Sequence, residues 1–133
     1  MSPQIARSIL DTDTLSEIFK GVGQQVLSNT NYYLDEHPQL TFTSVSVHEV
    51  LYGLHAKAAA RQIRDFHALI APHDEKTPDS RAFRIAAEIR AALQRVGTPI
   101  GAFDPLIAAC ALSRDLPLVT GHLRHYGYIQ SLG

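Results

Sequence analysis

The chain has 133 residues, a formal net charge of −1 and a single cysteine. This length fits one domain, and 45% hydrophobic with 19% charged residues is typical of a globular protein rather than a disordered one. The near-zero net charge gives no whole-chain signal for binding nucleic acid or membranes, and no apolar stretch is long enough to span a bilayer. Cys110 is expected to be a small buried residue, which is compatible with a reducing, cytoplasmic setting. The first residues lack the apolar core of a signal peptide.

Hydrophobic periodicity and breaker residues predict an alternation of strands and helices. In chain order, the predicted elements are a strand at 5–10, a helix from near Thr14, a helix at 24–36, a strand at 40–45, a helix from Ser46, a helix at 58–70, a polar loop at 72–78, a helix at 79–96, a helix at 104–113 and a strand at 116–120. The buried stripe of the helix at 79–96 is expected to comprise Ala82, Ala86, Ile89, Leu93 and Val96. This order predicts a single α/β domain with a parallel sheet and helices on both faces.

Three acidic residues lie at predicted junctions between strands and helices: Asp11, Glu49 and Asp104. Parallel strands gather their carboxyl ends along one edge of a sheet, where ligands bind. Carboxylates distant in sequence could therefore meet there and hold a hard divalent cation. The spacing predicts a cluster but does not by itself decide its function.

Each of the three acidic residues also has a purely structural interpretation as a helix cap. Asp11 could cap the first helix, although Asp13 or Thr14 could do so alone. Glu49 fits the last position of a capping box that starts at Ser46, opposite the apolar stripe of its helix. Asp104 before a proline is typical of a helix start. Capping and metal binding are compatible, because a carboxylate has two oxygens.

Several segments of the chain resemble the PIN-domain ribonucleases, and specifically the VapC-type toxins of bacterial toxin–antitoxin pairs. The matching segments are residues 9–17, 43–53, 89–112 and 116–126. The most specific of them contains Gly-Thr-Pro-Ile-Gly, then Asp104, then Ile-Ala-Ala. The resemblance runs from about Ile9 to Tyr128 and implies a single PIN-like domain over 1–133, with a central parallel sheet of about four strands.

The resemblance places Asp11, Glu49 and Asp104 on the family's acidic positions. It implies that they are catalytic and hold Mg²⁺ (or Mn²⁺), which polarises a phosphate oxygen and activates a water for in-line attack on RNA. The secondary candidates for the site are Thr12, Asp13, Thr120 and His122. Asp13 stands where the family usually has asparagine, and His122 stands where an acidic residue or asparagine is common, which leaves open whether one metal or two are bound. Because family members often continue past the segment matching Leu132 with a last strand, we expect the final edge strand to be missing or shortened here.

The resemblance also implies partners: a VapB-type antitoxin, a transfer or ribosomal RNA substrate, a second copy of the chain in a homodimer, and no membrane. Six arginines give the middle of the chain a local positive bias that could serve RNA phosphates or form a solvated helix face. They are Arg61, Arg64, Arg81, Arg84, Arg90 and Arg95.

Two other functions stay open. The chain could be a degenerate PIN domain that only binds antitoxin or RNA, as His122 and the short C-terminal segment suggest. The spacing of Asp11 and Asp13 also mimics the nucleophile and acid of a haloacid-dehalogenase-like phosphatase. That second alternative requires a lysine in a suitable downstream motif, and none of the lysines has such a context.

Overall fold

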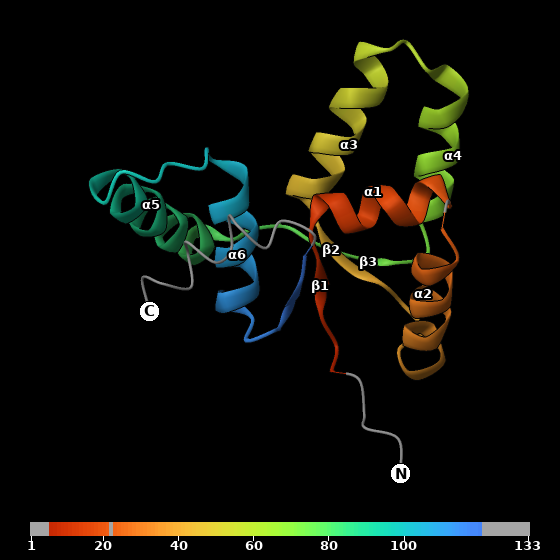
Figure 1. Cartoon of the computed structure of the whole chain (residues 1–133), viewed down its shortest axis with the longest axis horizontal. Coiled ribbons are helices and arrows are strands. Elements are labelled where there is room, and N and C mark those ends of the chain that lie inside the picture. Colours follow the sequence, from red (N-terminus) through yellow and green to blue (C-terminus); the bar gives the residue numbers. More distant parts are fainter. Residues whose placement is uncertain (1–5, 22, 121–133) are drawn as a thin grey trace.

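A computed structural model describes residues 6–21 and 23–120 of the chain (Figure 1). Its strands form one parallel sheet in the order β3-β2-β1-β4. The elements are β1 (Ile9–Leu10), α1 (Thr12–Lys20), α2 (Gln24–Glu36), β2 (Thr41–Thr43), α3 (Ser44–Ala56), α4 (Ala60–Ile70), β3 (Asp74–Lys76), α5 (Ser80–Arg95), α6 (Phe103–Ser113) and β4 (Leu118–Val119). The predicted α/β fold is therefore confirmed, and the prediction of α2 agrees with its observed bounds. None of the described helices is long and apolar enough to cross a membrane.

Strand β3 lies where a polar loop was predicted at residues 72–78. It pairs in parallel with β2, with Thr41 opposite Asp74 and Thr43 opposite Lys76. The prediction was wrong because Asp-Glu-Lys has low strand propensity and shows no alternation of apolar and polar residues. In the described sheet β3 is an end strand, and charged side chains are common on such strands because they discourage pairing with other chains.

The helices after β1 and β2 begin earlier than the capping-box motifs predicted. The N-cap of α1 is Asp11, and the N-cap of α3 is Thr43, whose hydroxyl accepts a hydrogen bond from the backbone N–H of Ser46 at 3.2 Å. Both cap residues have extended backbone angles and directly follow a strand. The end of each strand therefore sets the helix start, and neither Ser/Thr-x-x-Glu motif acts as a cap.

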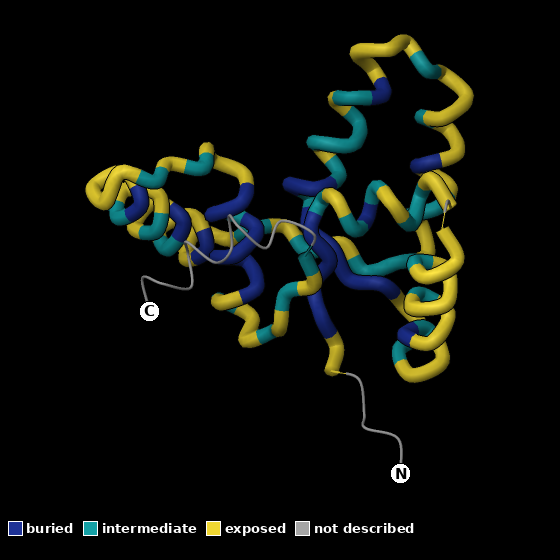
Figure 2. Tube along the Cα trace, viewed as in Figure 1, coloured by how far each residue is buried: buried dark blue, intermediate teal, exposed yellow. Residues whose placement is uncertain are grey.

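Helices cover both faces of the sheet because neighbouring strand residues point in opposite directions. Leu10 belongs to a core cluster with Phe42 and Phe66 beneath α1 to α4, whereas Ile9 packs with Cys110 of α6 (Figure 1). Figure 2 shows these buried stretches gathered along the strands and along the inner side of α6. Cys110 is buried with a free thiol, as expected.

The buried stripe of α5 agrees with the prediction except at its last member. Ala82, Ala86 and Leu93 are buried and Ile89 is partly buried, but Val96 is 64% exposed. Val96 is the C-cap residue of the helix, and the chain turns there through Gly97 at φ 80°. The side chain therefore lies beyond the region where α5 packs on α6.

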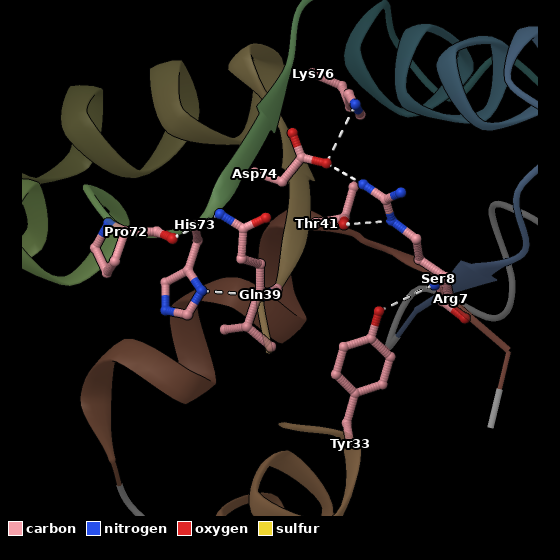
Figure 3. Close-up of polar contacts among 10 residues, drawn as sticks. Arg7, Ser8, Tyr33, Gln39, Thr41, Pro72, His73, Asp74 and Lys76 are labelled. Carbon is pink, nitrogen blue, oxygen red and sulfur yellow. Dashed lines mark hydrogen bonds and ion pairs between the residues drawn. The ribbon is translucent and has the colours of Figure 1, made fainter. Parts of the chain in front are cut away.

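The amino ends of the strands are joined by polar contacts of their own (Figure 3). The guanidinium of Arg7 contacts the carboxylate of Asp74, which also lies 3.2 Å from the ammonium of Lys76. The Nδ1 atom of His73 accepts a hydrogen bond from the backbone N–H of Leu40 at 3.0 Å, and burial lowers the pKa of this imidazole below its usual 6.5. These contacts fix β1, β2 and β3 at the end of the sheet away from Asp11.

Candidate functional site

Asp11 lies where β1 ends and α1 begins, and only 1% of it is exposed. Its Oδ1 accepts a hydrogen bond from the backbone N–H of Thr14 at 2.9 Å, and its Oδ2 accepts one from the hydroxyl of Thr120 at 2.6 Å. Thr120 follows β4, which pairs with β1. The carboxylate is therefore held by groups from two strand ends that are far apart in sequence. The sequence left open which residue caps α1, and the structure shows that Asp11 does.

Glu49 approaches the same edge from α3, which packs against α1. Its Oε1 accepts a hydrogen bond from the hydroxyl of Thr12 at 2.6 Å, and the hydroxyl oxygens of Thr12 and Ser46 lie 2.9 Å apart. Because α3 begins at Ser44, Glu49 lies too far along the helix to serve in its N-terminal cap, so the capping-box prediction was wrong. Glu49 instead contacts the residue next to Asp11.

Asp104 lies in the first turn of α6 and is 8% exposed. The N-cap of this helix is Ala102, so the predicted capping role of Asp104 was wrong. Next to it, the ring of Phe103 meets the ring of His48 edge-on, with centroids 5.6 Å apart. Since His48 precedes Glu49, this contact joins the start of α6 to the helix that carries Glu49.

The structure thus joins the segments that carry the three predicted carboxylates. Asp11 is the N-cap of α1 and Asp104 lies in the first turn of α6, and the helix dipole favours negative charge at both positions. Within the described part of the chain, however, no three His, Cys, Asp or Glu side chains are grouped closely enough to hold a metal ion as they stand. A cation shared by all three carboxylates therefore stays a prediction.

The chemistry of the donors fits a hard divalent cation. The carboxylate and hydroxyl side chains at this site all offer oxygen atoms, which are the ligands that Mg²⁺ and Mn²⁺ prefer. A carboxylate has about four lone-pair positions, and the two hydrogen bonds to Asp11 use only part of that capacity. Asp11 is therefore oriented by its protein contacts without losing its ability to coordinate.

The secondary candidates have different positions. Thr12 and Thr120 each hydrogen-bond to a predicted catalytic carboxylate, whereas Asp13 is exposed in the first turn of α1. His122 lies outside the described residues. Sequence reasoning missed Ser46 as a site residue, although its position three residues before Glu49 places both on one helix face.

Comparison with known proteins identifies the class of protein to which this site belongs. The PIN domain family model matches residues 9–125, so the chain belongs to the PIN-domain family. The predicted family is therefore confirmed. PIN-domain nucleases are hydrolases that in general depend on divalent metals, and the family does not support the phosphatase alternative.

Two curated relatives are more specific. The chain is 29% identical over 125 residues to the tRNA(fMet)-specific endonuclease VapC of Salmonella typhimurium (strain LT2), covering 93% of this chain and 92% of that protein. It is 30% identical over 95 residues to the protein of the same name from Shigella flexneri, covering 71% and 72%. Both relatives are thus named as endonucleases specific for a transfer RNA.

Solved structures agree with the fold. A DNA-bound VapBC from Salmonella typhimurium matches with a TM-score of 0.78 and 28% identity, over 92% of each chain. VapBC2 from Rickettsia felis, bound to a DNA fragment from its promoter, also has a TM-score of 0.78, over 90% of each chain. At 19% identity the second likeness supports the fold alone.

Proposed function

We propose that this chain is a metal-dependent endoribonuclease and the toxin of a VapBC-type toxin–antitoxin pair. The observation that carries the proposal is the buried carboxylate of Asp11, held by Thr14 and Thr120 where β1 and β4 end. Glu49 is tied to the residue next to it. The endonuclease relatives, matched over most of their length, support the same activity.

In the proposed reaction, Asp11, Glu49 and Asp104 would hold Mg²⁺ (or Mn²⁺). When bound, such a cation polarises a phosphate oxygen and lowers the pKa of a water molecule. The threonines keep two of these carboxylates in place: Thr120 and the N–H of Thr14 orient Asp11, and Thr12 orients Glu49. Asp11 and Glu49, which accept these hydrogen bonds, would then serve as metal ligands rather than as covalent nucleophiles.

The proposed substrate is RNA, with transfer RNA favoured over ribosomal RNA by the names of the two curated relatives. The arginines of α4 and α5 singled out in the sequence are exposed and available for phosphate contacts. The likeness to VapBC complexes supports a VapB-type antitoxin as partner. We further propose a homodimer that acts in the cytoplasm.

The test is Asp104→Asn, which keeps the size of the side chain but removes its charge. Asp65→Asn in α4 is the matched control, because Asp65 is exposed on a helix that carries none of the three carboxylates. Wild type and the control should arrest growth when expressed and cleave transfer RNA in Mg²⁺, and a chelator should stop cleavage. Asp104→Asn should slow cleavage by roughly 100-fold, as expected for losing about 3 kcal/mol of transition-state stabilisation.

Equal cleavage by Asp104→Asn and wild type would refute the assigned site. A wild-type protein that binds antitoxin or RNA tightly but cleaves no RNA, with Mg²⁺ or Mn²⁺ present, would instead identify a degenerate PIN domain. Cleavage that persists unchanged after chelation would refute the dependence on metal.

A further inference from the structure

Ser46 is a buried polar residue that was predicted to start a capping box, but Thr43 caps α3 in its place. It is fully buried in the first turn of α3, and its hydroxyl oxygen lies 2.9 Å from that of Thr12. Its backbone N–H is already satisfied by the hydroxyl of Thr43, so the side chain is not needed to cap the helix. A fully buried hydroxyl beside an acidic site therefore needs its own explanation.

The contacts of Thr12 decide the direction of the hydrogen bonds. Thr12 has one hydroxyl hydrogen, and a carboxylate such as that of Glu49 accepts hydrogen bonds but cannot donate them. The 2.6 Å separation from Glu49 is typical of a hydroxyl donating to a charged oxygen. A Thr12 hydrogen directed at Glu49 is not available to Ser46, so the 2.9 Å contact between the two hydroxyls then needs the hydrogen of Ser46.

We propose that Ser46 is a positioning residue: its hydroxyl fixes the rotation of the Thr12 hydroxyl, which in turn holds the Glu49 carboxylate toward Asp11 for metal binding. Ser46, Thr12 and Glu49 form an ordered relay in which each oxygen but the last donates one hydrogen bond. Because Thr12 follows Asp11 in the chain, the relay also ties Glu49 of α3 to the start of α1. The functional consequence rests on the proposed function, whereas the hydrogen-bond order does not.

Ser46→Ala removes the first donor of the relay, and Ser44→Ala is its matched control. Ser44 lies in the same helical turn, but its hydroxyl donates a hydrogen bond at 2.7 Å to Glu75, which is not one of the three predicted metal ligands. Ser46→Ala should weaken Mn²⁺ binding, measured by the paramagnetic signal of the ion, by about 10-fold or more, as is usual for residues that orient metal ligands. It should also lower kcat for RNA cleavage with little change in KM, and Ser44→Ala should leave both constants within about twofold of wild type.

Variants of Thr12 test whether the two hydroxyls act as one unit. Thr12→Val keeps the branched shape and removes the hydroxyl, whereas Thr12→Ser keeps the hydroxyl and should restore metal affinity. In the double variant, adding Ser46→Ala to Thr12→Val should lower the Mn²⁺ affinity little further, because Thr12→Val alone already removes the hydroxyl that contacts Glu49. Additive losses, or equal Mn²⁺ affinity for Ser46→Ala and wild type, would overturn the proposal.

A readout without metal separates this proposal from the nuclease activity itself. The carboxyl ¹³C resonance of Glu49 in the metal-free protein should shift in Ser46→Ala and Thr12→Val, and stay near its wild-type position in Ser44→Ala and Thr12→Ser. If the wild type neither binds Mn²⁺ nor cleaves RNA, the proposed function fails, and these shifts still decide whether the relay exists. An unchanged resonance in Ser46→Ala would show that Ser46 does not position Glu49.

Discussion

Two aspartates of this chain cap helices in nearly the same way, but only one of them lies at the candidate site. Asp11 caps α1 with φ −79° and ψ 177°, and Asp79 caps α5 with φ −89° and ψ −178°. Each accepts a hydrogen bond from the N–H three residues ahead, at 2.9 Å for Asp11 and 2.8 Å for Asp79. Replacing each with alanine therefore removes the same capping bond from two helices of one protein.

The two alanine variants should differ in activity far more than in stability. Loss of an N-cap costs about 1 kcal/mol, which lowers the melting temperature of a domain of this size by about 4 °C. Asp79→Ala should show a shift of this order, and Asp11→Ala a somewhat larger one, because Asp11 is buried and also loses the hydrogen bond from Thr120. If Asp11 binds the metal, Asp11→Ala should also lose about 3 kcal/mol or more of transition-state stabilisation, or roughly 100-fold in cleavage rate.

The assay is cleavage of transfer RNA in Mg²⁺, at a temperature where both variants are folded, beside thermal unfolding followed by circular dichroism. The asparagine variants of the same two residues provide a second comparison, because asparagine caps helices as well as aspartate does. They should melt close to wild type, and only Asp11→Asn should lose activity. Equal cleavage rates for Asp11→Ala and Asp79→Ala would show that Asp11 serves only as a cap, and the proposed mechanism would be wrong.

Two further outcomes concern the stability of the fold. Burial lowers the pKa of His73 below its usual 6.5 in the folded protein. As the pH falls below 6.5, the unfolded chain therefore binds a proton at His73 that the folded protein does not yet bind, and the free energy of unfolding should decrease. Denaturant titrations between pH 5 and 8 should show this slope, and His73→Asn, which keeps an acceptor for the N–H of Leu40, should flatten it below about pH 6.5. Phe42→Ala should lower the free energy of unfolding by about 3–5 kcal/mol, because Phe42 is fully buried in β2 and a cavity would remain. A loss below about 1 kcal/mol in urea unfolding would contradict this account of the core.

The local pattern of the sequence was sufficient for most of the fold. Apolar residues at helical spacing marked α2 and most of the buried stripe of α5. The prediction of three carboxylates at junctions of strands and helices holds for Asp11 alone, because Glu49 lies in the second turn of α3 and Asp104 lies in α6, which follows another helix. The parallel sheet followed from the order of the elements, because parallel strands need a connection that crosses over the sheet. Family resemblance then added the nuclease function, which the spacing of the carboxylates alone did not provide.

The tertiary structure decided what the sequence pattern left ambiguous or misplaced. Strand β3 exists because β2 offers it hydrogen-bonding partners, and no property of Asp-Glu-Lys by itself predicts this pairing. The ends of β1 and β2 determine which residues cap α1 and α3. Glu49 is therefore not part of the cap of α3, and its carboxylate accepts a hydrogen bond from the hydroxyl of Thr12. The sequence pointed to the three acidic residues as candidates for the site. Their supporting hydroxyls on Thr12, Ser46 and Thr120 depend on contacts between residues far apart in the chain, which only the folded packing creates.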